Sequence, residues 1–95
     1  MPAFMVVEVR YDDMGWTAAY RRDVPPMLVR AGARYIAKSL APERLEGDED
    51  APDTLAVIEF PSAEAARAFL ASPEYQPYGD ARQAGARTRI YLIEE

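Results

Sequence analysis

Hydrophobic and polar positions change their period several times along the chain, and each change marks a predicted element. Stretches rich in β-branched and aromatic residues predict four strands, at residues 3–11, 33–40, 54–60 and 88–94. The first strand has apolar residues on both faces, which predicts an inner strand covered on both sides. The second strand is interrupted at Ala41-Pro42, because proline has no N–H for a ladder. We expect it to resume at 43–46 and to lie at a sheet edge.

After the first strand, apolar residues recur every three or four positions, which predicts a helix. It runs from about 13 to 23, breaks at Pro25-Pro26, and continues as a short piece from 25 to 31. A side chain of Asp12-Asp13 is expected to cap its start, and Gly32 to end it in the left-handed conformation.

A second helical pattern covers 63–71 after Ser62, which is a favourable N-cap residue. Ser72-Pro73 is expected to restart a helix that reaches Gly85. The order β-α-β-β-α-β, with right-handed crossovers, predicts a ferredoxin-like α+β fold with a four-stranded antiparallel sheet and helices on one face. The bare face of the sheet would expose large apolar side chains, which predicts a homodimer that pairs sheet against sheet.

The composition of the chain excludes several classes of partner and of active site. Ninety-five residues suit one domain spanning 1–95, and the net charge of −5 disfavours a nucleic-acid partner. The chain has no Cys and no His, which excludes thiol nucleophiles, thiolate metal sites and histidine-based triads. The acidic stretch 46–53 lacks the spacing of an EF-hand, so we expect neither a metal nor a cofactor. The N-terminal apolar run is broken by Glu8, which indicates no signal peptide, no membrane partner and, by default, a cytoplasmic protein.

One block of the sequence carries a family resemblance. The run from Glu59 to Phe69 (EFPSAEAARAF), then Ser72-Pro73-Glu74-Tyr75 and Arg82, resembles the domain of unknown function 1330 family, and the similarity covers essentially the whole chain. The chain departs from the family pattern at Ala33, where a second glycine is usual, and at Trp16, where tyrosine is more common.

The resemblance implies a dimeric α+β barrel. That superfamily includes cofactor-independent monooxygenases, haem-degrading enzymes and lactone isomerases. The absence of histidine disfavours haem degradation, because the usual axial ligand is missing.

Arg82 is the first candidate for a site residue. It shares a helical face with Tyr75 and Tyr78, where its guanidinium can hold a carboxylate or an enolate in bidentate geometry. The alternative is a structural ion pair with Glu59 or Glu74.

Glu59 is the candidate for a general base, because a carboxylate among apolar strand residues must be paired or have a raised pKa. The alternative is an ion pair with Arg34, Arg89 or the second subunit.

Aromatic residues complete the expected site. Trp16, Tyr20, Tyr35 and Tyr75 would line a cavity between helices and sheet and orient a planar ligand. The alternative is that they simply fill the core.

These residues and the resemblance together give the hypothesis that this otherwise uncharacterised protein is a cofactor-independent enzyme for a small organic acid or a phenolic compound. A monooxygenase-like reaction would rely on a substrate carbanion, and an isomerase-like reaction on Glu59 as base and Arg82 as anion holder. The alternatives are a non-catalytic ligand-binding or structural homodimer, or a subunit of a larger assembly.

Overall fold

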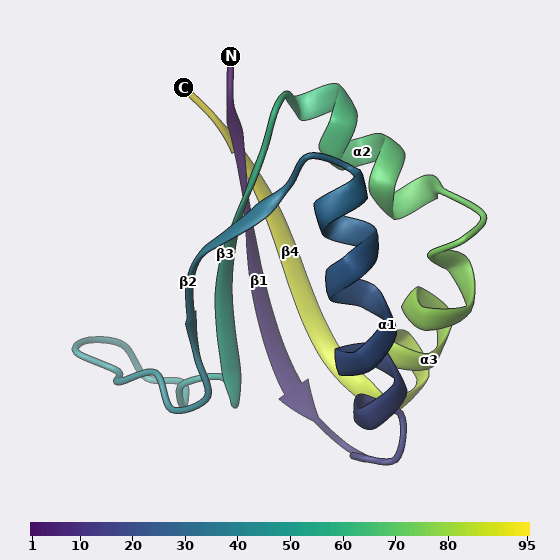
Figure 1. Cartoon of the computed structure of the whole chain (residues 1–95). Helices are drawn as coiled ribbons and strands as arrows, with labels where there is room; N and C mark the ends of the chain where they lie inside the picture. The colour runs from purple at the N-terminus through teal and green to yellow at the C-terminus, as the bar shows by residue number, and fades with distance from the viewer.

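Four antiparallel strands form one sheet, and three helices pack on one of its faces (Figure 1). The computed structural model describes residues 1–95. The elements are β1 (Ala3–Tyr11), α1 (Thr17–Arg30), β2 (Arg34–Ser39), β3 (Thr54–Phe60), α2 (Ala63–Ala71), α3 (Gln76–Gly85) and β4 (Ala86–Glu94). The predicted ferredoxin-like order is confirmed, with the second crossover divided into two helices.

The strands lie in the order β2-β3-β1-β4, so β1 is an inner strand and β2 an edge strand, as predicted. A bulge between Tyr35 and Ala37 shifts the register of β2 against β3. The predicted continuation of this strand at 43–46 is wrong. Because Ser39 already pairs with Leu55, near the start of β3, the residues that follow have no neighbouring strand. They belong to the segment that projects from the sheet (Figure 1).

The turn before α1 differs from the predicted cap. The backbone N–H groups of Asp12 and Asp13 donate to the carbonyl of Gly85, at 3.0 and 2.9 Å. The Oδ1 atom of Asp13 accepts a hydrogen bond from the N–H of Gly15 at 3.2 Å. These bonds tie the turn to the end of α3, so the helix begins at Thr17 and neither aspartate caps it.

The predicted break in α1 at Pro25-Pro26 is also wrong. The two prolines remove two N–H donors, but the helix continues to Arg30 because its inner side is anchored in the core. Val24 and Leu28, on either side of the prolines, are 2% and 3% exposed. The predicted left-handed end at Gly32 is confirmed by a φ of +78°.

In the second crossover, the predicted start of the first helix is correct and the predicted start of the second is wrong. The Ser62 side chain accepts a 3.0 Å hydrogen bond from the first turn of α2, as predicted. Ser72-Pro73 does not start the next helix, because the Ser72 hydroxyl donates to the carbonyl of Phe69 at 2.8 Å and closes α2 instead. A turn follows, and α3 begins at Gln76 with Pro77 in its first turn, where a missing N–H costs no hydrogen bond.

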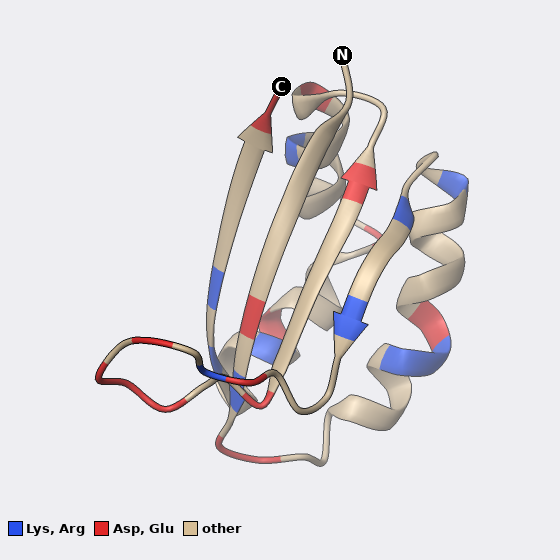
Figure 2. Ribbon diagram, turned by 90° about the vertical axis from the view of Figure 1, so that its left-hand side faces the viewer, with Lys and Arg blue, Asp and Glu red and all other residues tan.

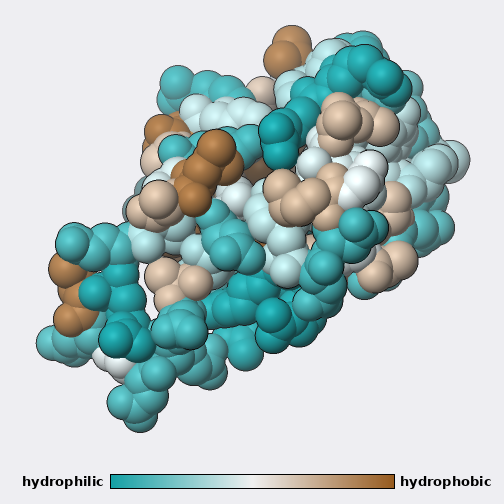
Figure 3. Space-filling view, turned by 90° about the horizontal axis from the view of Figure 1, so that it is seen from below, coloured by the Kyte–Doolittle hydropathy of each residue, from teal (hydrophilic) through white to brown (hydrophobic).

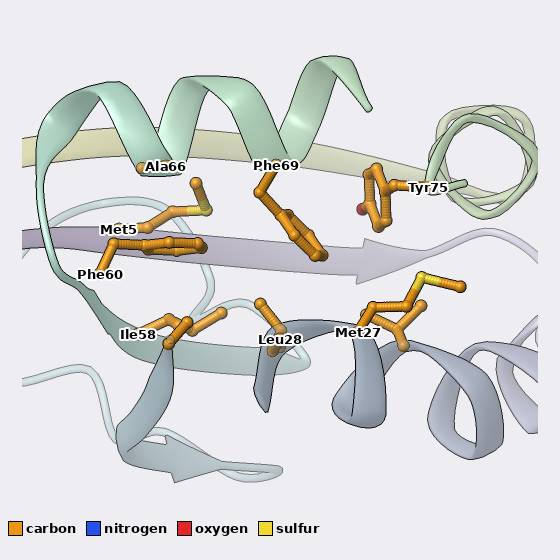
Figure 4. Packing of buried hydrophobic residues seen from close by; sticks show 10 residues of the cluster. Met5, Met27, Leu28, Ile58, Phe60, Ala66, Phe69 and Tyr75 are labelled. Carbon is orange, nitrogen blue, oxygen red and sulfur yellow. The ribbon is translucent and has the colours of Figure 1, made fainter. Parts of the chain in front are cut away.

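The core lies between the sheet and the helices. Ala66 and Phe69 point from α2 toward Phe60, and Leu28 reaches the same layer from α1 (Figure 4). The Phe69 ring lies 5.8 Å from the Phe60 ring and 4.8 Å from the Tyr75 ring, measured between centroids. The cluster comprises ten buried residues: Met5, Val24, Met27, Leu28, Ala33, Ile58, Phe60, Ala66, Phe69 and Tyr75.

No helix or strand covers the other face of the sheet, and only the segment between β2 and β3 lies over one end of it, where Glu49 contacts Arg10 and Arg89 (Figure 2). Charged residues lie toward both ends of this face, with Glu59 and Arg34 at the end away from the projecting segment, and apolar residues such as Val6 and Val57 lie between them. Seen from below, the end near the projecting segment is mainly hydrophilic, with separate hydrophobic patches (Figure 3). None of the helices has the length and hydrophobicity that a membrane span requires.

Candidate functional site

A cavity of about 370 Å³ lies between the sheet and the helices, next to the core. Its walls are mostly hydrophobic and come from all four strands and all three helices. The structure brings five of the predicted site residues together around it: Trp16, Tyr20, Tyr35, Tyr75 and Arg82. These aromatic residues therefore surround an open space.

Arg82 is the buried charge of this cavity. Its side chain extends from α3 and is 5% exposed. Its Nε donates to the hydroxyl of Tyr75 at 3.3 Å, and its Nη1 donates to Oγ1 of Thr88 at 2.6 Å. Both partners are neutral, so the guanidinium has no counter-ion within the chain.

The alternative ion pairs of Arg82 are wrong. Glu59 pairs with Nε of Arg34 at 2.7 Å, and Glu74 pairs with Nη2 of Arg30 at 3.0 Å. Both carboxylates lie on other surfaces of the molecule.

Glu59 is not part of the cavity. Within β3 the cavity is lined by Thr54, Ala56 and Ile58, and Glu59 has the opposite parity and therefore faces away from the helices. The ion pair with Arg34 is the one anticipated as the alternative to a catalytic role. No Asp or Glu lines the cavity, so it holds no carboxylate base.

Tyr20 and Tyr75 form a hydrogen-bonded pair at the Arg82 end of the cavity. Their hydroxyl oxygens are 2.5 Å apart, although the residues are far apart in sequence. Two phenols carry two O–H hydrogens and the mutual bond uses one, so one remains free to donate to a ligand. Burial, and then the neighbouring Tyr75, raise the pKa of the Tyr20 hydroxyl. Tyr20 therefore stays protonated at neutral pH and acts as a hydrogen-bond donor.

Two glycines of α3 give the aromatic rings their positions. A Cβ at Gly79 would lie 2.9 Å from Cε2 of Tyr75, and a Cβ at Gly85 would lie 2.5 Å from Nε1 of Trp16. Only a missing side chain lets each ring lie against the helix. Trp16 in turn packs edge-on against Tyr20, with a centroid distance of 5.4 Å.

Two cations that the sequence pattern did not indicate also line the cavity. Lys38 lines the cavity together with Tyr35, and its Nζ lies 5.3 Å from the centre of the Tyr35 ring. In a regular strand, residues three apart point to opposite faces. The bulge in β2 changes this, because Tyr35 pairs with Ile58 and Lys38 with Ala56, which share the helix-covered face. A bulge is not encoded by any short motif here. Arg21 of α1 is the other missed cation.

The acidic segment between β2 and β3 offers no metal centre. No group of three or more Asp and Glu side chains is placed to hold an ion. Its Glu49 contacts Arg10 and Arg89 of the sheet instead, each at 3.8 Å.

The fold and the site define a ferredoxin-like α+β domain with a ligand-sized cavity that ends at a buried arginine. Residues 2–95 match the family described as Domain of unknown function (DUF1330), and the chain belongs to this family. The family resemblance in the sequence is thus confirmed. No functionally curated protein matches the chain.

Solved structures with the same fold include a protein of unknown function from Rhodopseudomonas palustris. It is 24% identical, with a TM-score of 0.84 over 99% of this chain and 82% of its own. SnoaB, a cofactor-independent oxygenase from Streptomyces nogalater, is 15% identical, with a TM-score of 0.70 over 99% of this chain and 92% of its own. An antibiotic biosynthesis monooxygenase is 14% identical, with a TM-score of 0.61 over 100% and 98%. These three proteins therefore share the ferredoxin-like α+β fold of this chain.

Proposed function

We propose that the chain is a cofactor-independent, oxygenase-like enzyme whose cavity binds a small planar organic acid or phenolic compound as its anion. The observation that carries this proposal is the guanidinium of Arg82, which is 5% exposed and has no carboxylate partner. A buried charge without a counter-ion is costly, and an anionic ligand would supply the missing charge. The planar guanidinium suits a carboxylate, an enolate or a phenolate.

The residues around Arg82 favour the anionic form of such a ligand. Arg82 stabilises the negative oxygen, and the free O–H of the Tyr20–Tyr75 pair donates a second hydrogen bond to it. The hydrophobic walls exclude water and strengthen both interactions. Arg82 and the hydroxyl lower the pKa of a bound enol or phenol, so the ligand binds as the anion that forms when its proton is released to the solvent.

An electron-rich anion of this kind can react with dioxygen directly. In the overall reaction a CH₂ group becomes a carbonyl, one oxygen atom stays in the product, and the other leaves as water. The substrate supplies all four electrons that dioxygen takes up, so no reductant is needed. The fold shared with SnoaB, a cofactor-independent oxygenase, supports this reaction class by analogy.

The cavity favours this reaction over isomerisation. An isomerase-like mechanism was expected to use Glu59 as its base, and Glu59 lies on the other face of the sheet. The second candidate function is non-catalytic binding of the same ligands, which the cavity would serve without any reaction.

Dioxygen uptake with an anthrone as the probe tests the proposal, because an anthrone has an acidic CH₂ beside a carbonyl. We expect uptake with the wild type and a loss of about 100-fold or more in Arg82→Ala, the size of effect seen when an oxyanion donor is removed. Arg82→Lys keeps the charge but not the bidentate geometry and should also be impaired. The matched control is Arg67→Ala, which removes an exposed arginine from α2.

Oxygen uptake and anthrone binding together distinguish the enzyme from a non-catalytic binding protein. Equal rates in Arg82→Ala and the wild type, with both folded by circular dichroism, would refute the catalytic proposal. Binding of the anthrone without oxygen uptake would support the non-catalytic alternative instead.

We also propose that the bare sheet face pairs with a second copy in a homodimer. Val6 and Val57 lie opposite each other there and are half-buried, while Tyr91 and Ile93 are 53% and 51% exposed. Val57→Asp is expected to give a monomer by light scattering. The control Ala68→Asp adds the same charge at an exposed position of α2 and should leave the mass of the dimer unchanged. A Val57→Asp dimer with wild-type stability would contradict the pairing.

A further inference from the structure

Some basic side chains of this protein form ion pairs with acidic residues, and others do not. Six of the eleven Lys and Arg residues form ion pairs: Arg10, Arg22, Arg30, Arg34, Arg87 and Arg89. Among the five without an ion pair, Arg21, Lys38 and Arg82 all line the one large apolar cavity, and the others are Arg44 and Arg67. No Asp or Glu lines that cavity, although acidic residues outnumber basic ones in the chain.

These three cations do not lie at the same place. Arg82 is buried and reaches Thr88 of β4, the strand at one edge of the sheet. Lys38 is exposed and belongs to β2, the strand at the opposite edge. Arg21, on α1, is exposed as well. The cavity therefore has a buried cationic end and an open cationic rim.

The register of the sheet shows what lies between the two ends. Lys38 pairs with Ala56, Ala56 with Val7, and Val7 with Ile90. All four residues line the cavity, so they form one row across its floor. Three strand spacings separate the outer members, about 14 Å between the backbones of β2 and β4. The middle of the row is apolar.

We propose that the cavity takes ligands with two acidic groups at opposite ends of an apolar, ring-containing body. One group binds Arg82, and the other binds Lys38 and Arg21 at the rim. The apolar row and the aromatic side chains contact the body between them. This inference rests on the proposed function, because Arg82 must hold an anion, and it adds the substrate class.

The two ends contribute differently. The rim cations are exposed, so water and salt screen them and an ion pair there strengthens binding only modestly, by roughly three- to tenfold. The buried end is dry, so loss of Arg82 should weaken binding of any acidic ligand much more. The rim thus selects diacids over monoacids, and the buried end selects acids over neutral molecules.

Isothermal titration calorimetry with naphthalene-2-carboxylate and naphthalene-2,6-dicarboxylate tests the inference. The wild type should bind the diacid roughly three to ten times more tightly than the monoacid. Arg21→Gln/Lys38→Gln should bind both probes with the affinity of the wild type for the monoacid. The matched control is Arg44→Gln/Arg67→Gln, which removes two other unpaired cations and changes the net charge equally.

Each outcome points to one conclusion. An equal fall in diacid affinity in both double variants would mean that only net charge matters, and would overturn the inference. Equal binding of the two probes by the wild type, with binding lost in Arg82→Ala, would show that Lys38 and Arg21 bind no second acidic group. It would overturn the inference and leave the proposed anion site at Arg82 intact. Absence of binding by the wild type to either probe would overturn both proposals.

Discussion

Gly85→Ala tests the close contact that positions Trp16 at the cavity. The added Cβ would lie 2.5 Å from Nε1 of Trp16 and closer still to Cδ1. The indole is rigid and cannot bend its near edge away. It has to move as a whole, which disturbs its edge-on contact with Tyr20.

Two opposing contributions decide how much Gly85→Ala changes the free energy of unfolding. Overpacking a filled contact costs about 1–3 kcal/mol, and replacing glycine by alanine in a helix returns about 0.4–1 kcal/mol through the unfolded chain. The net loss is about 1–2 kcal/mol, which lowers Tm by roughly 4–15 °C in a domain of this size. The control is Gly15→Ala, whose Cβ would meet nothing nearer than 3.5 Å.

Thermal unfolding by circular dichroism measures both variants. Fluorescence of Trp16, the single tryptophan of the chain, reports whether the ring moves. If the contact is the cause, Trp16→Phe should remove at least half of the cost of Gly85→Ala in a double-mutant cycle. A Tm for Gly85→Ala equal to or above that of Gly15→Ala would refute the reasoning.

Three further predictions concern the core, the tyrosine pair and acid stability. Phe69→Ala removes a buried ring and should lower the free energy of unfolding by about 3–5 kcal/mol in urea titrations; a loss below about 1 kcal/mol would contradict its place in the core. Tyr75→Phe leaves Nε of the buried Arg82 without its partner and should cost about 1–3 kcal/mol by the same measurement, whereas an unchanged value would mean that water replaces the hydroxyl. Hydrogen bonds from Arg22, and then from Tyr78, lower the pKa of Asp23 from 3.8 to about 2, so the stabilisation is present above about pH 4 and lost as the pH falls toward 2. Asp23→Asn should therefore flatten the pH dependence of Tm in that window, and an unaltered profile would speak against this carboxylate.

The arrangement of elements was largely predictable from local patterns. Alternating and helical periods indicate the four strands and the crossovers, and they place Arg82 on a helix that begins directly after Tyr75, its neighbour in the site. Apart from the break expected at Pro25-Pro26 inside α1, the errors fall at the ends of elements. A turn tied to Gly85 displaced the start of α1, and the hydroxyl of Ser72 closed α2 where a new helix was expected. At such points long-range or competing hydrogen bonds decide between local options of similar free energy.

Strand parity shows why the role of Glu59 was harder to predict. In β3 both sets of alternating residues are apolar, with Leu55 and Val57 on one face and Ala56 and Ile58 on the other. Hydrophobicity therefore does not indicate which face the helices cover. The structure places Glu59 on the bare face, beside Arg34.

The sequence by itself determined which segments form strands and helices, since period and side-chain type act over a few residues. It also indicated five of the residues that line the cavity, namely Trp16, Tyr20, Tyr35, Tyr75 and Arg82. Only the tertiary structure decided that the hydroxyls of Tyr20 and Tyr75 meet, that a bulge turns Lys38 toward the cavity, and that no carboxylate reaches Arg82. Each of these depends on contacts between distant segments, whose distances are fixed only when the helices close onto the sheet.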